Sequence, residues 1–259
     1  MEKAILHDPY WMLFATAVLA VSALVHGTLG FGFPLISTPL IALVADMQTA
    51  VVLTVLPNLA VNLVSIVRGG RWGASIGRHW PMALWVLLGT LVGTRLLLSV
   101  NTGILKLLLA GMIAVYLVQD RIKMLDWSVI ARHPKWAGVV LGMMAGVLSG
   151  AVNVALPPLV IYFMALGLEP LPMTQILNLC FLAGKSTQAA SFALAGHFDR
   201  DTLQLSVPLA ILSVVMLWVG MRLQRNIDPR GYRRLVFLAL TVMALLLVAQ
   251  SLLPIIGAA

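Results

Sequence analysis

Cysteine and charged residues are both scarce in this sequence. Of 259 residues, 10% are charged and one, Cys180, is a cysteine. A lone cysteine excludes an intramolecular disulfide and a thiol cluster that could hold a metal ion. The sequence also lacks an HExxH motif and a Ser-His-Asp set. A membrane-embedded enzyme is therefore not expected, and no cofactor or metal is predicted.

Carboxylates are absent from the middle of every long apolar segment. Pumps that carry protons or cations usually place such carboxylates within the membrane. The sequence therefore disfavours cation transport and favours a site for anions. All nine acidic residues lie in termini, loops or segment ends: Glu2, Asp8, Asp46, Asp120, Asp126, Glu169, Asp199, Asp201 and Asp228.

Apolar residues make up most of the chain. The hydrophobic share is 61%, the mean hydropathy is +0.99, and residues 9–45 contain no Asp, Glu, Lys or Arg. Uncharged runs of roughly 17 residues or more are typical of membrane-spanning helices. A membrane β-barrel would instead show alternating segments of about ten residues. We predict an all-α polytopic membrane protein.

Basic residues are concentrated in three segments. Twelve of the 17 Lys and Arg residues fall in 68–79, 119–136 and 222–234. This placement follows the positive-inside rule, so we expect these loops on the cytoplasmic side of a bacterial-type plasma (inner) membrane. The net charge of +8 therefore indicates orientation in a lipid bilayer and not a nucleic-acid partner. The oligomeric state stays open.

The two halves of the chain share an ordered series of residues. Internal duplication of this kind is typical of secondary transporters. We predict an N-terminal tail (1–10), a first transmembrane repeat (11–118), a basic cytoplasmic linker (119–136), a second repeat (137–253) and a C-terminal tail (254–259). The matches are Gly27 with Gly146, Pro39 with Pro158, Pro81 with Pro208, and the V-G-x-R-L elements 92–96 and 219–223.

Each half begins with a long apolar segment that glycine and proline interrupt. Ordinary spanning helices are expected at 48–67, 80–98 and 103–119, and at 173–194, 203–222 and 232–252. If each interrupted segment returns to the side from which it entered, all three basic loops share one side. The two halves are then inverted repeats, each a broken helical hairpin, re-entrant or spanning, plus three transmembrane helices.

Glycine and proline at the hairpin tips carry this prediction. Glycine allows turn conformations, and proline ends one helix and suits the first turn of the next. The alternative is a pair of kinked helices packed closely through glycine. The expected helix breakers are Gly27, Pro34, Pro39, Gly146, Gly150, Pro157 and Pro158.

Two stretches resemble a known family. HGTLGFGFPLISTPLIALV (26–44) and GVLSGAVNVALPPLVIYFMALGL (146–168) resemble the sulfite exporter TauE/SafE family, also described as sulfonate uptake permeases. The resemblance covers about 11–253. It implies a secondary transporter of small sulfur-containing anions: sulfite, sulfoacetate or other organosulfonates. Asn153 stands where a small residue is usual, which suggests a different substrate within the family.

Backbone donors at the tips are the first candidates for an anion site. Half-helix N-termini offer N–H groups without intrahelical acceptors and a positive dipole end. We expect the second arms to begin near residues 31–34 and 152–155. The candidates are Gly30, Phe31, Gly32 and Phe33 at the first tip and Ser149 and Asn153 at the second.

Lys185 is the clearest cation within a predicted span. It has no acidic neighbour in its segment, and intramembrane ionisable residues are usually functional. We interpret it as an anion-binding charge. The alternative is a lysine that bonds to backbone carbonyls or snorkels to the membrane surface.

Other polar residues complete the candidate site. Asn58 and Asn62 are four apart and share a helix face, and Asn178, Ser186 and Gln188 flank Lys185. The alternative for these amides is interhelical hydrogen bonding. His26 precedes the first tip and would bind substrate, carry a proton in a coupled cycle, or remain neutral against a backbone carbonyl.

The sequence thus predicts alternating access around an anion held at the midplane between two hairpin tips. A carboxylate or other small-anion transporter and an anion channel of the same architecture are the alternatives. The direction of transport and the coupling ion stay open.

Overall fold

The computed structural model is helical throughout the part of the chain that it describes, residues 8–69, 72–118, 127–198, 200–224 and 229–256. The predicted tails and basic segments lie partly outside these ranges, at 1–7, 70–71, 119–126, 225–228 and 257–259. No strand occurs in the described ranges, in agreement with the predicted fold class.

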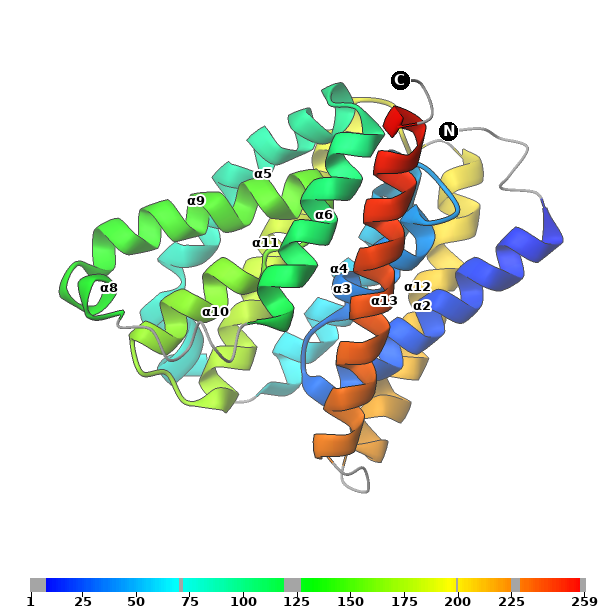
Figure 1. Ribbon diagram of the computed structural model, residues 1–259. Coiled ribbons are helices and arrows are strands. Elements are labelled where there is room, and N and C mark those ends of the chain that lie inside the picture. Colours follow the sequence, from blue (N-terminus) through cyan, green and yellow to red (C-terminus); the bar gives the residue numbers. More distant parts are fainter. Residues whose placement is uncertain (1–7, 70–71, 119–126, 199, 225–228, 257–259) are drawn as a thin grey trace.

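The first half contains five main helices (Figure 1). These are α2 (Pro9–Leu29), α3 (Phe33–Ala42), α4 (Met47–Gly69), α5 (Pro81–Ser99) and α6 (Thr102–Leu117), with the short π-helix η1 (Gly73–Gly77) before α5. After the short helix α8 (Ser128–Arg132), the second half repeats the same order. It contains α9 (Pro134–Val152), α10 (Leu156–Ala165), α11 (Pro170–Leu194), α12 (Arg200–Leu223) and α13 (Pro229–Ile256).

In the described part of the chain, six helices are long and apolar enough to cross a membrane: α2, α4, α5, α9, α12 and α13. α6 has 16 residues, fewer than the roughly 20 that a helix needs to cross a bilayer. α11 has 25 residues, but Gln175, Asn178, Lys185 and Gln188 interrupt its apolar character. These four side chains are buried inside the bundle, where protein rather than lipid surrounds them.

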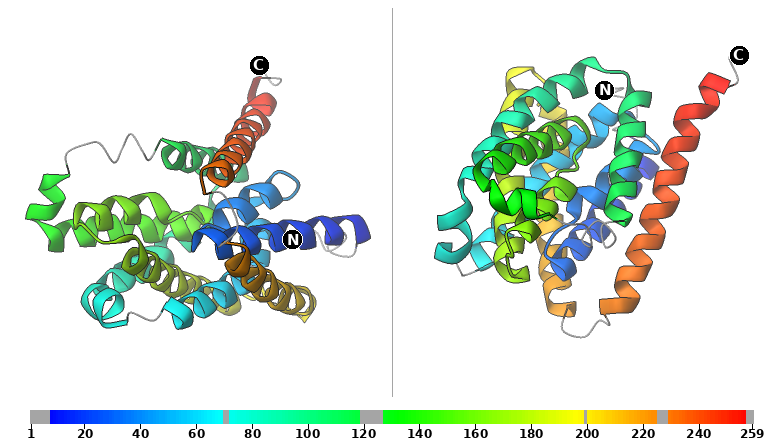
Figure 2. Two further views of the ribbon diagram at one scale, coloured as in Figure 1. Left: turned by 90° about the horizontal axis from the view of Figure 1, so that it is seen from below. Right: turned by 60° about the vertical axis from the view of Figure 1, so that its left-hand side comes forward.

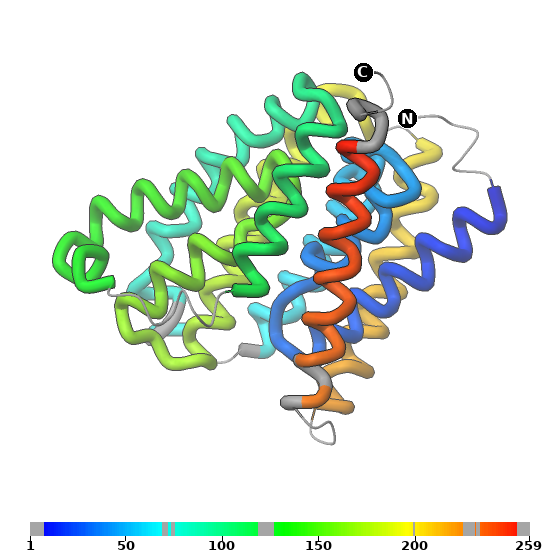
Figure 3. The backbone as a smooth tube through the Cα atoms, in the orientation of Figure 1, coloured from blue at the N-terminus to red at the C-terminus, as the bar shows by residue number. Residues whose placement is uncertain are grey.

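The interrupted segments form two asymmetric hairpins. α2 and α9 have 21 and 19 residues, about 31 and 28 Å long at 1.5 Å per residue. The return arms α3 and α10 have ten residues each, about 15 Å, which is half the thickness of a bilayer core. Figure 3 shows α2 turning back into α3 and α9 turning back into α10.

The two hairpins pack against helices of the opposite half. α9 lies along α5, α2 lies along α12, and α4 packs against α11 in the interior. α6 and α13 form a further pair at one edge of the bundle (Figure 2). These pairings join the halves along their whole length and bring the two hairpin tips together.

Candidate functional site

The first hairpin turns within three residues. Gly30 follows α2 with a φ of 82°, and its N–H donates to the His26 carbonyl at 2.7 Å. Gly32 precedes α3 with a φ of 109°. Both values lie in the left-handed region, where glycine is at the least disadvantage. Pro34 then stands in the first turn of α3, where its missing N–H is not needed.

The second hairpin turns at Asn153. Its φ of 64° is the only positive φ of a non-glycine residue in the described ranges. Asparagine tolerates this region better than most residues with a side chain. Pro157 and Pro158 follow in the first turn of α10. Both first arms therefore end at a left-handed residue, glycine at one tip and asparagine at the other. The return arms begin differently, because Gly32 is left-handed and Ala155 has a φ of −106°.

The Asn153 side chain connects the second tip to the first half. Its Nδ2 donates to Thr38 Oγ1 of α3 at 2.7 Å and to Thr54 Oγ1 of α4 at 3.1 Å. All three residues are buried. Asn153, which stands where a small residue was expected, thus fixes the second tip against α3 and α4 of the first half.

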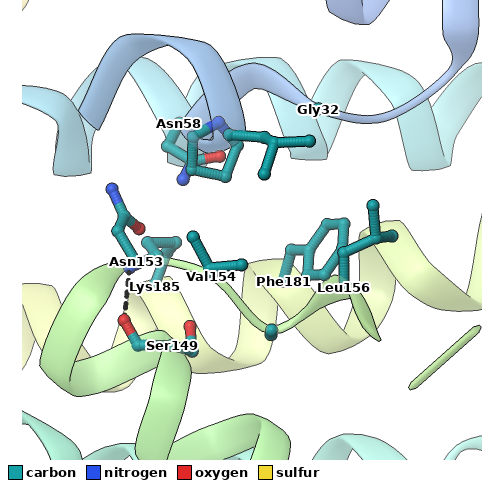
Figure 4. Close-up of a pocket in the computed structure, with 11 residues that line it drawn as sticks. Gly32, Asn58, Ser149, Asn153, Val154, Leu156, Phe181 and Lys185 are labelled. Atoms are coloured by element: carbon teal, nitrogen blue, oxygen red, sulfur yellow. Dashed lines mark hydrogen bonds between the residues drawn. The ribbon is translucent and has the colours of Figure 1, made fainter. Parts of the chain in front are cut away.

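A small enclosed cavity lies between the two tips. Its volume is about 10 Å³ for the centre of a water-sized sphere, roughly the space of one water molecule. Figure 4 shows Gly32 and Asn58 on one wall, and Ser149, Asn153, Val154 and Leu156 on the other. The full lining is Gly32, Pro34, Leu35, Asn58, Ser149, Asn153, Val154, Ala155, Leu156, Phe181 and Lys185.

Lys185 is the charged residue of this lining. Its side chain is 1% exposed, and its Nζ donates to the Ser149 carbonyl at 3.3 Å and to Gln188 Oε1. Gln188 Nε2 in turn donates to the Gly150 carbonyl at 2.8 Å. Both carbonyls belong to the last turn of α9, where the helix dipole favours a cation. Lys185 thus bonds to a backbone carbonyl, as the alternative interpretation from the sequence expected. Its side chain also lines the cavity, as an anion-binding residue would.

Asn58 presents an amide group to the cavity. Its Nδ2 is buried without a hydrogen-bond partner in the described part of the chain. Its Oδ1 accepts from Asn62 Nδ2, which also donates to the Asn58 carbonyl at 2.7 Å. Asn62 therefore positions Asn58 and does not itself reach the cavity. An orphaned buried donor beside a lysine suits an anionic ligand.

His26 is buried outside the cavity. Ser65 Oγ donates to the Val61 carbonyl at 2.8 Å, so its oxygen is free to accept from His26 Nε2 at 3.2 Å. His26 Nδ1 then accepts from the Phe33 N–H at 3.4 Å. A neutral imidazole protonated at Nε2 satisfies both contacts.

Asn178 supports the first tip from the second half. Its Nδ2 donates to the Gly30 carbonyl at 2.9 Å and to the Thr174 carbonyl at 2.8 Å. Together with the Asn153 bonds, this contact ties each tip to a helix of the other half.

The structure brings only some of the predicted site residues to the cavity. Gly32, Asn58, Ser149, Asn153 and Lys185 line it. Three predicted backbone donors are already engaged: Gly30 N–H donates to the His26 carbonyl, Phe33 N–H to His26 Nδ1, and Asn153 N–H to the Ser149 carbonyl. Ser186 is exposed on the outside of α11. The predicted residues outside the lining are His26, Gly30, Phe31, Phe33, Asn62, Asn178, Ser186 and Gln188.

Four of the predicted helix breakers do not break a helix. Gly27 lies within α2, Gly146 and Gly150 lie within α9, and Pro39 lies within α3. The glycines serve close packing instead. A Cβ added at Gly27 would lie 3.0 Å from Gly220 Cα, and one at Gly146 would lie 2.8 Å from Gly89 Cα. The breaks occur at residues 30–32 and 153–155, beside Pro34, Pro157 and Pro158.

Sequence reasoning missed several residues around the cavity. Thr38 and Thr54 hold Asn153, and Phe181 lines one wall. Thr54 and Phe181 each lie four residues before a predicted site residue, Asn58 and Lys185, and so share its helix face. This spacing of four residues could have identified Thr54 and Phe181 from the sequence.

Comparison with known proteins identifies the family. Residues 13–247 match the family described as Sulfite exporter TauE/SafE. No curated protein and no solved structure matches the chain. The matched range covers both hairpins, the cavity between them and the paired helices around it. The chain therefore belongs to the sulfite exporter TauE/SafE family of membrane transporters.

Proposed function

We propose that this chain transports sulfite or a related small sulfur-containing anion, bound between the two hairpin tips. One observation carries the proposal: the cavity at the tips contains a buried lysine and an orphaned amide donor, and none of the described residues that line it is a carboxylate. A cation there would meet Lys185 without a compensating charge. An anion would neutralise it.

The donors present fit a compact oxyanion. The Lys185 ammonium has three N–H groups, two of which are used by Ser149 and Gln188. The third N–H and Asn58 Nδ2 are left for a ligand. The N-terminal ends of α3 and α10 add positive dipole ends at the same cavity. Pro34, Pro157 and Pro158 remove N–H groups from these ends, so side chains supply most of the donors.

We further propose that the halves are inverted repeats, about 11–118 and 137–253, joined by the basic linker 119–136. α3 and α10 have equal lengths and begin 123 residues apart, at Phe33 and Leu156. This register places Gly27 opposite Gly150, one helical turn from the register that the sequence alone suggested. Lys185 then corresponds to Asn62, so the charge belongs to one half only.

Sidedness follows from the helix ends. In Figure 1 α13 ends at the upper end of the molecule, while α4 and α12, with Arg68 and Arg222 in their last turns, end at the lower end. The positive-inside rule makes the lower end cytoplasmic. Each hairpin then enters from and returns to one side.

The size of the cavity supports a carrier and not an open channel. Space for about one water is too small for a sulfite ion, so the tips must separate for an anion to bind. In alternating access, one repeat would rock against the other around the tips.

The first test is ligand binding by the purified protein. Thermal stability is measured with sulfite, sulfoacetate, taurine, sulfate, phosphate and acetate, because a ligand that binds the folded state raises its apparent stability. The variants are Lys185→Met and, as a matched control, Lys106→Met. Lys106 is in α6, where its Nζ donates to Gln250 Oε1 at 3.1 Å, away from the tips.

We expect sulfite or a sulfonate to stabilise the wild type and the control, and to lose its effect in Lys185→Met. Stabilisation by acetate alone would make the protein a carboxylate transporter. Stabilisation that persists without Lys185 would move the anion to another site. Sulfite flux into vesicles then separates a carrier, which saturates, from a channel.

A further inference from the structure

A second and much larger cavity lies at the basic end of the α9–α10 hairpin. Its volume is about 480 Å³, within the range of ligand pockets and far beyond the needs of a single small anion. It lies at the beginning of α5 and α9, which are both candidate membrane spans. Its lining is Arg78, His79, Pro81, Met82, Trp85, Pro134, Lys135, Gly138, Val139 and Tyr162.

The polar groups of this cavity suit an anion. Arg78 and Lys135 are exposed cations on two different segments, and no carboxylate lines the cavity among the residues that the structure describes. His79 precedes α5, and burial together with the neighbouring Arg78 lowers the pKa of His79 below its ordinary value of 6.5. At neutral pH it is therefore an uncharged hydrogen-bonding group in the lining, next to Arg78.

The floor of the cavity is fixed by Tyr162 of α10. Its hydroxyl donates to the Pro134 carbonyl at 3.1 Å. Gly138 leaves room for this ring, because a Cβ there would lie 3.0 Å from the Tyr162 hydroxyl. His79 also packs edge-on against Phe163, with ring centroids 5.9 Å apart. The Tyr162 hydrogen bond and the His79–Phe163 ring contact therefore connect α10 to the beginnings of α9 and α5 on either side of the cavity.

The surroundings of the cavity are those of a membrane surface. Trp80 and Trp136 lie beside it and are 50% and 75% exposed. Tryptophan prefers the headgroup level of a bilayer. Further along α5, Leu84 and Leu88 are exposed and share the helix face of the lining residue Pro81, at three and seven residues from it.

We propose that this cavity binds the phosphate-bearing headgroup of an anionic phospholipid from the leaflet on the basic side. Basic pockets between spanning helices are known to hold such headgroups. The cations would contact the phosphate, the indole of Trp85 would face the glycerol region, and the aliphatic surface would carry the acyl chains. A free oxyanion would use the cations but neither the volume nor the aliphatic surface.

The test compares lipids on the purified full-length protein in a neutral detergent. Thermal stability and lipid retained in native mass spectrometry are measured with short-chain phosphatidylglycerol, short-chain phosphatidylcholine and inorganic phosphate. The cavity variant is Arg78→Gln with Lys135→Gln. The matched control is Arg222→Gln with Arg234→Gln, which removes the same charge from exposed positions of the basic side outside the cavity.

We expect phosphatidylglycerol to stabilise the wild type more than phosphatidylcholine does. This excess should fall by at least half in the cavity variant and stay in the control. An equal loss in both variants would assign the effect to diffuse surface charge and overturn the proposal. If inorganic phosphate stabilises the wild type as much as phosphatidylglycerol does, and this effect is lost in the cavity variant, the ligand is a free oxyanion and the lipid proposal is wrong. The readouts do not depend on which anion is transported.

Discussion

Lys185 and Asn58 show how single residues define the candidate site. Lys185 is fully buried in a helix without a carboxylate, and its Nζ donates to the Ser149 carbonyl at the end of α9 and to Gln188 Oε1. Asn58 faces the same cavity from the opposite half with an unpaired Nδ2. A buried donor that lacks an acceptor is costly, so a ligand oxygen is its natural partner.

Replacing the Asn58 amide by a carboxylate tests this assignment. Asn58→Asp puts an acceptor in place of the free donor, and the new carboxylate would pair with Lys185. We expect binding of the anion to weaken by at least tenfold, about 1.4 kcal/mol, in calorimetric titrations. Asn101→Asp is the matched control, because Asn101 caps α6 through its side-chain oxygen, which aspartate also provides. An unchanged affinity in Asn58→Asp would remove Asn58 from the site.

Asn153 combines a backbone role with a side-chain role. Its φ is positive, and its amide bonds to Thr38 and Thr54. Asn153→Gly keeps the turn and loses only the side-chain bonds. Asn153→Ala loses both.

We expect Asn153→Ala to lower the free energy of unfolding by about 2–4 kcal/mol, from two hydrogen bonds and a strained φ. Asn153→Gly should lose about half as much. Equal losses, measured by unfolding in a denaturing detergent, would show that the positive φ contributes nothing.

At the scale of helices, close glycine contacts set how the hairpins pack. Gly220 of α12 meets α2 so closely that a Cβ there would lie 3.1 Å from Gly27 Cα and meet the Leu24 carbonyl. Gly93 of α5 has the same relation to Ala151 N of α9, at 2.9 Å. Backbone atoms cannot move aside as a flexible side chain can. The long arms α2 and α9 are therefore held against α12 and α5.

The element-scale prediction is that Gly220→Ala separates α12 from α2. We expect a loss of about 1–3 kcal/mol of stability, typical of overpacking. Gly111→Ala in α6 is the control, since a Cβ there meets nothing within 4 Å. That control should be neutral or stabilising, because alanine favours helices more than glycine does. Thermal melting measures both variants, and equal behaviour would contradict the close contact.

At the scale of the whole molecule, the proposed sidedness rests on the hairpins. In the proposed topology each hairpin returns to its own side, which leaves three net crossings in each half and inverts one half relative to the other. The end of α13 then lies opposite the ends of α4 and α12 (Figure 1). The single thiol of the chain, Cys180, is buried. We therefore expect little labelling of the native cysteine when new cysteines are introduced.

Cysteines introduced one at a time test this topology. A membrane-impermeant maleimide added from outside should label Asn101→Cys, at the exposed connection between α5 and α6. Gln224 is exposed at the end of α12. The same maleimide should label Gln224→Cys only after the membrane is permeabilised. Labelling of both positions from the same side of intact cells would contradict the inverted arrangement.

The sequence by itself determined the membrane class, the family and the two interrupted segments, and it singled out Lys185, which the structure places in the cavity lining. These follow from composition, charge placement and residue order, which are local properties of the chain. The tertiary structure alone decided that Gly27, Gly146 and Gly150 pack instead of breaking helices, since this depends on what lies opposite them. It also decided which amides face the cavity. Asn58, Asn62, Asn178 and Gln188 are alike in sequence, but only Asn58 lines it. The amide of Asn62 bonds to Asn58, that of Asn178 to the Gly30 carbonyl, and that of Gln188 to the Gly150 carbonyl.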